Sequence, residues 1–285
     1  MKLVSVLICT YNAENTIERT IKSCLNQTYK NIEILIHDDQ SKDKTLEIIE
    51  NLWDDRIKII DSWKKLWPYK GLNFLLDNAK GEYIAIQDHD DLWHPKKIEK
   101  QIEFLEKNKQ YVWCWTKTLM RYEWDNKWFD YYLWDENYYT IHPSLVFRND
   151  KKYRYPNATY MCDAIFEKNV LCNWKNLIWN IDETLTIHRI KSWFKNYTYK
   201  RYKPNIQSLK TVFYLHPRRY GIWATIFELL RMIVYPTLHK IKKDNLINNF
   251  ERIPYLLLWF RTKTINNHLI YSGDFWENDF SNLIK

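Results

Sequence analysis

The stretch Gly81-Glu82-Tyr83-Ile84-Ala85-Ile86-Gln87-Asp88-His89-Asp90-Asp91-Leu92-Trp93-His94-Pro95 decides the interpretation of the chain. Its short apolar run ends in three carboxylates, and Pro95 then opens a Lys-rich helical pattern. This pattern predicts a buried strand that delivers acidic side chains to a sheet edge. Clustered carboxylates repel one another unless a cation lies among them, and such hard oxygen ligands suit Mg²⁺ or Mn²⁺. The structural alternative is a solvated acidic turn, or a helix capped by Asp90 or Asp91.

The residues before this stretch alternate between apolar runs and amphipathic patterns. This order predicts a β-α-β-α-β-α-β unit and a right-handed, doubly wound parallel sheet. Ligands of such sheets bind beyond the carboxyl ends of the strands. The predicted strands cover residues 3–9, 32–36, 57–60 and 83–86, and the predicted helices cover residues 14–25, 45–52 and 72–79.

Polar clusters follow three of the predicted strands. They are Thr10-Tyr11-Asn12, Asp38-Asp39 and the carboxylates of residues 88–91. Because the carboxyl ends of parallel strands meet at one edge, the three clusters are expected to converge there, which favours a ligand site over a capped turn. No GxGxxG or Walker A pattern follows the first strand, which argues against a dinucleotide-dependent oxidoreductase and a P-loop enzyme.

Residues 1–105 resemble the N-terminal half of family 2 type inverting glycosyltransferases, which have the GT-A fold. The chain departs from the family pattern at Gln40, Lys44 and Trp67, where the family favours Gly. The matching segments are Val4-Ser5-Val6 through Thr10-Tyr11-Asn12, Ser23 through Tyr29, Glu33 through Thr45, and Ala79 through Asp91.

This resemblance implies an α/β protein with a Rossmann-like, mostly parallel sheet that binds a nucleotide-sugar donor, most often a UDP-sugar. Asp39 would contact the uracil or its equivalent. Asp88, Asp90 and Asp91 match the DxD element, which would hold Mn²⁺ or Mg²⁺ at the donor diphosphate. The residues expected to bind the nucleotide sugar are Thr10, Tyr11, Asn12, Glu14, Asp39, Asp88, His89 and Arg189.

The resemblance is weaker beyond residue 105. The segment Ile141-His142-Pro143-Ser144-Leu145-Val146-Phe147-Arg148 resembles the strand that flanks the acceptor pocket. In the family an acidic residue before a helix deprotonates the acceptor hydroxyl, which makes Asp163 the candidate catalytic base. Cys162 replaces the Glu that often precedes it, and a helix N-cap is the structural alternative. Arg189 and His188 end the family's closing strand; either would contact phosphate, and His188 would equally suit a structural role.

The chain divides into a nucleotide-sugar-binding half at 1–105, an acceptor-binding half at 106–200 and a helical basic extension at 201–285. The net charge of +8 is unevenly placed, because residues 191–285 hold 16 Lys and Arg against 6 Asp and Glu (+10) and residues 1–190 hold 27 against 29 (−2). The apolar patterns at residues 222–238 and 253–260 would place this extension on an anionic membrane surface. Helices packed on the catalytic domain with a basic, solvated outer face are the alternative. No nucleic-acid-binding motif accompanies the charge.

The location expected for this protein is the cytoplasm, with peripheral contact at the inner face of the cell membrane. The five cysteines are scattered and never spaced as CxxC, which fits a reducing compartment and indicates neither a disulfide framework nor a zinc site. Residues 3–9 are interpreted as a strand rather than a signal peptide. No run of about 18 uncharged apolar residues is present.

The composition is poor in glycine and rich in tryptophan. Four Gly is far below the usual share of about 7%, whereas Trp reaches 15, and the sum of 19 in 285 residues matches the ordinary share of Gly. Trp also occurs where turns favour Gly, as in Asn173-Trp174 and in Trp124-Asp125-Asn126-Lys127-Trp128. Our hypothesis is that the gene uses UGA for glycine and that these codons are translated here as tryptophan. Trp93 and Trp276 lie in contexts that suit a real Trp, and a Trp-rich protein is the alternative.

The function expected from the sequence is an inverting, metal-dependent transfer of a sugar from a nucleotide donor to a hydroxyl group. The acceptor would be a saccharide or a lipid-linked molecule in cell-surface polysaccharide or glycolipid synthesis. A catalytically silent sugar-nucleotide or glycan-binding protein on the same fold is the alternative.

Overall fold

The computed structural model describes residues 1–122, 128–131, 141–157, 162–167, 177–190, 226, 229–230, 234 and 263–265. The predicted apolar patch at 253–260, most of the predicted helix at 222–238 and the Asn173-Trp174 turn lie outside these residues. Within the described ranges no helix is long and apolar enough to cross a bilayer.

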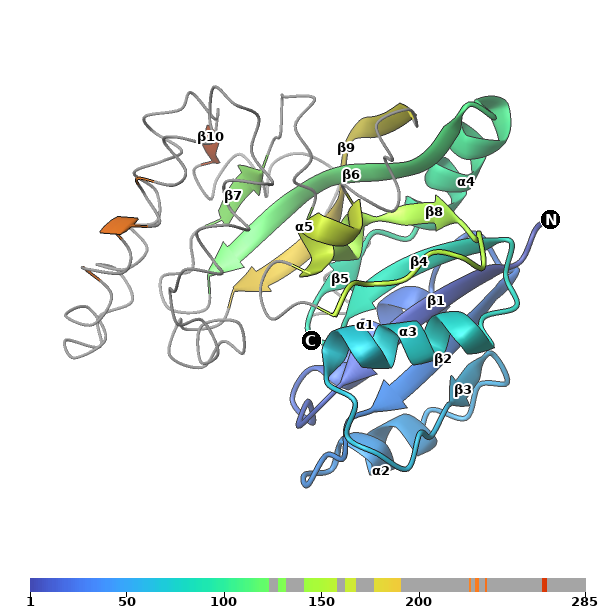
Figure 1. The fold of residues 1–285 in the computed structure, drawn as a ribbon, viewed down its shortest axis with the longest axis vertical. Coiled ribbons are helices and arrows are strands. Elements are labelled where there is room, and N and C mark those ends of the chain that lie inside the picture. The colour runs from blue at the N-terminus through green and yellow to red at the C-terminus, as the bar shows by residue number, and fades with distance from the viewer. Residues whose placement is uncertain are drawn as a thin grey trace.

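The first half of the chain forms the predicted alternation of strands and helices (Figure 1). The strands pair in parallel in the order β4-β1-β2-β3, so the predicted parallel sheet is confirmed. Helix α3 begins four residues before the predicted start, with Pro68 in its first turn, where the missing N–H of proline costs no hydrogen bond. The elements are β1 (Val4–Thr10), α1 (Ile17–Leu25), β2 (Ile32–Asp38), α2 (Thr45–Glu50), β3 (Ile57–Ile59), α3 (Pro68–Asn78) and β4 (Tyr83–Asp88).

The second half extends the same sheet through mostly antiparallel pairs, whereas β9 pairs parallel with β6. Strand β8 pairs antiparallel with β4, and β6 continues beyond it, which makes a mixed sheet. Strand β9 lies beside β6 and also pairs with the short β5, which follows the acidic residues directly. The elements are β5 (Leu92–Trp93), α4 (Lys97–Lys107), β6 (Tyr111–Tyr122), β7 (Trp128–Tyr131), the 3₁₀ turn η1 (His142–Ser144), β8 (Val146–Arg148), α5 (Cys162–Phe166), β9 (Leu177–Ile190) and β10 (Lys263–Ile265).

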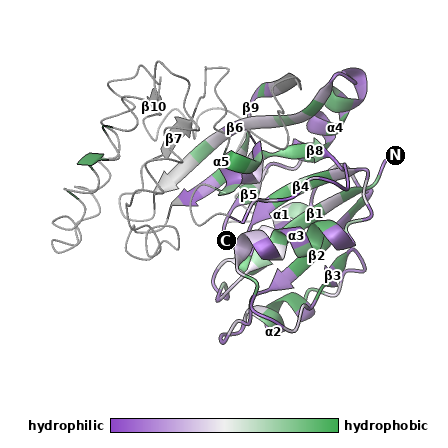
Figure 2. Ribbon diagram, in the orientation of Figure 1, coloured by the Kyte–Doolittle hydropathy of each residue, from purple (hydrophilic) through white to green (hydrophobic). Residues whose placement is uncertain are grey.

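Apolar side chains cover both faces of the parallel strands. Val4, Val6 and Ile8 of β1 belong to the core cluster that includes α1 and α4, whereas Leu7 packs with the leucines of α3 on the other face. Figure 2 shows hydrophobic segments on β1, β2 and α3, which meet in this core. A strand buried on both faces requires the nearly continuous apolar run seen in its sequence.

Gly81 begins the turn into β4 and touches β1 directly. A Cβ atom at this position would lie 2.5 Å from the backbone nitrogen of Ser5. The Gly81 N–H donates to Ser5 Oγ at 2.8 Å, and Ser5 Oγ donates to Glu33 Oε1 at 2.6 Å. Close packing rather than a special backbone angle therefore requires glycine here, and it fixes β4 against β1 at the start of the strand that carries Asp88.

Candidate active site

Three strand ends meet at one edge of the sheet. In the strand register Thr10 pairs with Asp38, and Cys9 pairs with Asp88. The Asp39 N–H donates to the Thr10 carbonyl at 2.8 Å, which joins the segments after β1 and β2. The structure thus brings together the three polar clusters that the sequence places after these strands.

The first wall of the site is built around Asp39. Its carboxylate is 6% exposed, and Oδ1 accepts hydrogen bonds from the backbone N–H groups of Leu66 and Trp67 at 2.6 and 3.1 Å. Tyr11 lies on the same side, with its side chain 39% exposed and the Lys65 ammonium 3.8 Å from its ring centroid. A flat ring and a fixed carboxylate at a solvent-accessible edge suit recognition of a planar, hydrogen-bonding group.

Asn12 and Glu14 hold the edge together through bonds between loops. Asn12 has a φ of 49°, its N–H donates to Ser41 Oγ at 2.8 Å, and its Oδ1 accepts from the Lys42 N–H at 2.9 Å. Glu14 Oε2 accepts from the Lys44 N–H at 3.2 Å. Both side chains therefore help to shape these loops, and the contact with a ligand that the sequence predicts for them stays a prediction.

The acidic stretch forms a cluster with the end of β9. The fully buried Asp91 places Oδ2 2.8 Å from His188 Nδ1, while Asp91 Oδ1 accepts the Arg189 N–H at 2.8 Å. Asp88, Asp91 and His188 each offer one ligand atom, and these atoms all lie within 4.8 Å of one another. The cluster therefore joins the end of β4 to a strand that is nearly one hundred residues away in the sequence.

The pKa values of Asp88, Asp91 and His188 differ from their ordinary values. Desolvation, followed by the charges of Asp91 and Asp90, raises the pKa of Asp88 to about 8. Desolvation also raises the pKa of Asp91 to about 6, against the opposing effect of His188. Burial alone would lower the pKa of His188, but the Asp91 carboxylate raises it to about 9. Negative charge is thus crowded around Asp88, and a divalent cation would relieve that crowding.

The donor set fits a divalent cation. Two carboxylates and one imidazole provide hard oxygen ligands and one nitrogen ligand, a combination that Mn²⁺ accepts readily and Mg²⁺ less often. Asp90, which the sequence predicts as a ligand, is outside this group of three, although its charge contributes to the raised pKa of Asp88. His89 places its Nδ1 3.3 Å from the Cys9 carbonyl at the end of β1.

The residues next to Asp88 come from η1, α5 and the segment before α5, which belong to the part of the chain predicted to bind the acceptor. His142 is buried, with Nδ1 3.9 Å from Asp88 Oδ1 and Nε2 2.7 Å from the Tyr155 hydroxyl. Asp163 lies in the first turn of α5 and is partly buried. Its negative charge contributes to the raised pKa values of Asp88, Tyr69 and Tyr155, so its carboxylate lies near enough to act on all three. The sequence alone assigns no role to His142 or Tyr155. The only indication is that His142-Pro143 lies in the segment that resembles the strand flanking the acceptor pocket.

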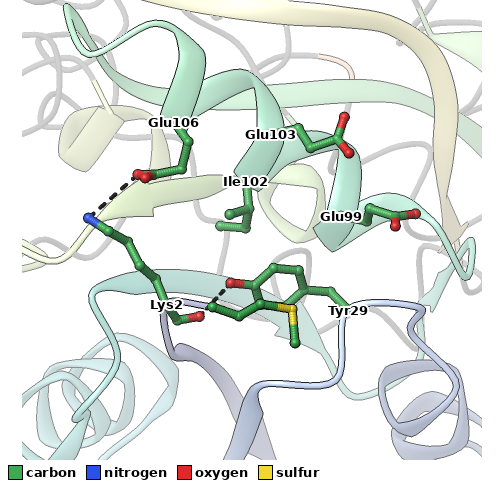
Figure 3. A pocket seen from close by; sticks show the side chains of 7 residues that line it. Lys2, Tyr29, Glu99, Ile102, Glu103 and Glu106 are labelled. Atoms are coloured by element: carbon green, nitrogen blue, oxygen red, sulfur yellow. Dashed lines mark hydrogen bonds and ion pairs between the residues drawn. The ribbon is translucent and has the colours of Figure 1, made fainter.

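Figure 3 shows a different pocket, at the amino end of β1. The Lys2 ammonium lies 3.6 Å from Glu106 Oε1, and the Tyr29 hydroxyl donates to the Lys2 carbonyl at 2.6 Å. Its three glutamates would repel a diphosphate, and it lies at the opposite end of β1 from the polar clusters. The lining residues are Met1, Lys2, Tyr29, Glu99, Ile102, Glu103 and Glu106.

Comparison with protein families agrees with this geometry. The pattern of "Glycosyl transferase family 2" matches residues 5–170, which is more than half of the chain. The chain belongs to glycosyl transferase family 2. The matched range includes nearly all of β1, the acidic stretch and Asp163, and the family resemblance seen in the sequence is confirmed.

Curated relatives match the N-terminal part. The chain is 47% identical over 109 residues to "UDP-Glc:alpha-D-GlcNAc-diphosphoundecaprenol beta-1,3-glucosyltransferase WfaP" of Escherichia coli, covering 38% of this chain and 43% of that protein. It is 44% identical over 111 residues to the putative glycosyltransferase EpsE of Bacillus subtilis, covering 38% of this chain and 40% of that protein. The match thus spans about two fifths of the length of these relatives.

Solved structures share the fold. TarS 1–349 of S. aureus in complex with UDP-GlcNAc aligns with a TM-score of 0.61 and 18% identity, over 82% of this chain and 73% of that one. The mannosyltransferase PcManGT of Pyrobaculum calidifontis in complex with GDP-Man and Mn²⁺ aligns with a TM-score of 0.59 and 13% identity, over 89% of this chain and 80% of that one. The predicted GT-A fold is therefore confirmed.

Proposed function

We propose that the protein is an inverting glycosyltransferase that moves a sugar from a UDP-sugar to a hydroxyl group of a lipid-linked saccharide. The observation that carries this proposal is the convergence of the ends of β1, β2 and β4 on the cluster of Asp88, Asp91 and His188. Membership of glycosyl transferase family 2 supports the reaction class.

The donor nucleotide would lie against the wall formed by Thr10, Tyr11 and Asp39. Asp39 Oδ1 is already held by two backbone N–H groups, so the carboxylate has a fixed orientation. Its Oδ2 would accept the imino N–H of the uracil, which sets the preference for the base. A structural neighbour binds UDP-GlcNAc, and a curated relative is named for transfer from UDP-Glc, which supports a UDP-sugar.

The donor diphosphate would lie at the cluster of Asp88, Asp91 and His188, with Asp90 and Arg189 beside it. When bound there, Mn²⁺ or Mg²⁺ would neutralise the negative charge that develops on the departing diphosphate. Asp91 holds the His188 ring and the Arg189 backbone in place through its two carboxylate oxygens. A structural neighbour contains Mn²⁺ with its donor, which supports this placement of a cation.

Asp163 is the proposed base. Its carboxylate would take the proton of the acceptor hydroxyl while the hydroxyl oxygen forms a bond to the anomeric carbon. The bond between that carbon and the diphosphate breaks at the opposite face, so the configuration inverts and the nucleoside diphosphate leaves with the bonding electrons. The partly buried position of Asp163, and its electrostatic effect on Asp88, support a base close to the donor.

The acceptor is proposed to be membrane-linked. The relative WfaP is named for an acceptor that carries diphosphoundecaprenol. The 16 Lys and Arg of residues 191–285, against 6 acidic residues, would keep the enzyme at the inner, anionic face of the membrane.

A transfer assay tests the proposed function. Purified protein is incubated with radiolabelled UDP-glucose or UDP-GlcNAc, a GlcNAc-diphosphate lipid acceptor and Mn²⁺, and the lipid fraction is counted. We expect label in the lipid that depends on the cation and disappears with Asp163→Asn. Tight, Mn²⁺-dependent UDP binding without transfer to any acceptor or to water would instead indicate a silent binding protein.

A further inference from the structure

His142 connects the acceptor side of the site to Asp88. The imidazole is buried against η1, and its two nitrogens face different partners. Nδ1 lies 3.9 Å from Asp88 Oδ1, and Nε2 lies 2.7 Å from the Tyr155 hydroxyl. The Asp88 side chain is 40% exposed and lies at the solvent edge of the cluster that it forms with Asp91 and His188.

Tyr155 is held rigidly. Its backbone N–H donates to Asn73 Oδ1 at 2.8 Å, and its carbonyl accepts from Asn73 Nδ2 at 3.0 Å. Its ring stacks on Phe166 with 4.0 Å between centroids. Burial raises the pKa of Tyr155 well above its ordinary value, so the phenol keeps its proton and can donate it to His142 Nε2.

The partner of one imidazole nitrogen determines the role of the other. The Tyr155 hydroxyl lies 2.7 Å from Nε2, which leaves Nδ1 as the ring nitrogen that faces Asp88, 3.9 Å from its Oδ1. We propose that His142, held by Tyr155 at Nε2, is a positioning residue that orients Asp88 for the donor. This inference rests on the proposed function for the identity of the donor.

Two amide substitutions distinguish the role of Nδ1 of His142 from that of Nε2. The side-chain NH₂ of His142→Asn takes the place of Nδ1 on the side of Asp88, whereas that of His142→Gln takes the place of Nε2 and faces Tyr155. The readout is the affinity for UDP in the presence of Mn²⁺, measured by calorimetry, together with KM and kcat for the donor. Loss of a residue that orients a metal ligand typically lowers affinity or activity by 10- to 100-fold. We therefore expect the affinity for UDP to fall by about that factor in His142→Gln and by about threefold or less in His142→Asn.

Equal affinities for UDP in the two variants, whether both high or both low, would overturn the inference, because a purely structural histidine would not distinguish them. Tyr155→Phe is expected to weaken UDP binding in the same direction as His142→Gln. The binding readout also separates this inference from the proposed function. A protein that binds UDP in the predicted order of variants but transfers no sugar would refute the function and leave the role of His142 standing.

A second, independent observation concerns left-handed backbone positions. Among the described residues, five that are not glycine have a positive φ, and three of these are tryptophan: Trp53 at 43°, Trp63 at 57° and Trp67 at 65°. The other two are Asn12 and Gln40. The Cβ atom of a bulky residue is crowded in this region, which glycine enters without penalty. Gly71 and Gly81, the glycines of the described ranges, have no positive φ.

Two of these indoles, Trp53 and Trp63, bury little of their ring surface. Trp53 is 89% exposed and Trp63 is 84% exposed. Trp93, in contrast, is fully buried, and its Nε1–H donates to the Pro143 carbonyl at 2.8 Å. Burial of the ring and a bonded N–H are what a folded protein normally obtains from tryptophan. The structure therefore distinguishes exposed tryptophans with a positive φ from a tryptophan that is buried and hydrogen-bonded.

We infer that positions 53, 63 and 67 are glycine in the natural protein, because its source reads UGA as glycine, and that Trp93 is a true tryptophan. The combined count of 19 Gly and Trp in 285 residues, close to the ordinary glycine content, agrees with this assignment.

Peptide mass spectrometry of the protein from its natural source, together with the codons of the gene, tests this inference. We expect UGA codons and glycine masses at positions 53, 63 and 67, and a UGG codon with a tryptophan mass at position 93. Tryptophan masses at the first three positions would overturn it. In recombinant protein, the triple variant Trp53→Gly, Trp63→Gly, Trp67→Gly should unfold at a higher temperature than the printed sequence, and Trp93→Gly at a lower one. A lower unfolding temperature for the triple variant would also contradict the inference.

Discussion

Replacing Lys97 by methionine is expected to stabilise the protein at pH 7. Lys97 begins α4, directly after the acidic stretch, and its side chain is fully buried. Its ammonium lies 4.1 Å from the ring centroid of Trp93, and within the part of the chain that the structure describes no hydrogen-bond partner reaches Nζ. A buried cation without a hydrogen bond is costly, and a methionine of similar length would fill the same space.

The magnitude follows from the pKa. Desolvation lowers the pKa of Lys97 from 10.5 to about 7. At about 1.4 kcal/mol per pH unit, this lowering of the pKa corresponds to a destabilisation of the folded protein by roughly 5 kcal/mol. Methionine would lose the favourable contact between the ammonium and the Trp93 ring, which offsets on the order of 1 to 2 kcal/mol of the gain. Lys97→Met should therefore raise the free energy of unfolding at pH 7 by about 3 to 4 kcal/mol.

The lowered pKa of Lys97 also determines how the stability gained by Lys97→Met changes with pH. Between pH 7 and 10.5 the unfolded chain keeps the Lys97 proton and the folded protein does not, so the stability of the wild type rises with pH. The advantage of Lys97→Met should shrink by about 1.4 kcal/mol per pH unit. Cys24 and Cys114 face the same ammonium, and desolvation raises the pKa of each thiol to about 12. Both variants carry these thiols, so the difference between the two variants isolates Lys97.

Urea unfolding at pH 7, 8 and 9 measures this difference. The matched control is Lys107→Met, which changes an exposed lysine on the same helix and should alter the stability by less than about 0.5 kcal/mol at every pH. A destabilised Lys97→Met protein, or a difference that stays constant from pH 7 to 9, would refute the reasoning.

Three further substitutions are expected to separate the roles of other residues. Asp163→Asn should lower kcat by about 100-fold or more while UDP affinity is retained, because a base acts only in the chemical step; unchanged turnover would remove this assignment. Asp39→Ala should weaken UDP binding by about 10- to 100-fold, because the uracil would lose a charge-assisted hydrogen bond. An unchanged affinity in calorimetry would show that the uracil binds elsewhere. Gly81→Ala should lower the free energy of unfolding by about 1 to 3 kcal/mol in urea, since the new Cβ would lie 2.5 Å from the Ser5 nitrogen, and a neutral effect would contradict that packing.

Local patterns in the sequence were sufficient to predict the parallel half of the fold. Apolar runs buried on both faces mark β1, β2 and β4, and the polar residues at their ends are near one another because the strands are parallel and adjacent. The convergence of Thr10, Asp39 and Asp88 therefore required no knowledge of distant contacts.

Long-range pairings could not be predicted in this way. Asp91 bonds to His188 because β9 pairs with β5, a pairing that no local pattern specifies. Lys97 belongs to a Lys-rich helical pattern that indicates a solvated face, but α4 packs with this lysine against Trp93. In both cases tertiary packing, rather than periodicity, determines the environment of the side chain.

The central claim is that Asp88, Asp91 and His188 hold a divalent cation beside the donor diphosphate. Its most direct test is the binding of Mn²⁺ measured by electron paramagnetic resonance, with and without UDP, in the wild type, Asp88→Asn and His188→Ala. The control is Glu103→Gln, in the separate acidic pocket of Figure 3. We predict that UDP strengthens Mn²⁺ binding in the wild type and in Glu103→Gln, and that both site variants lose this effect. Wild-type Mn²⁺ binding in Asp88→Asn and His188→Ala, or its loss in Glu103→Gln alone, would contradict the claim.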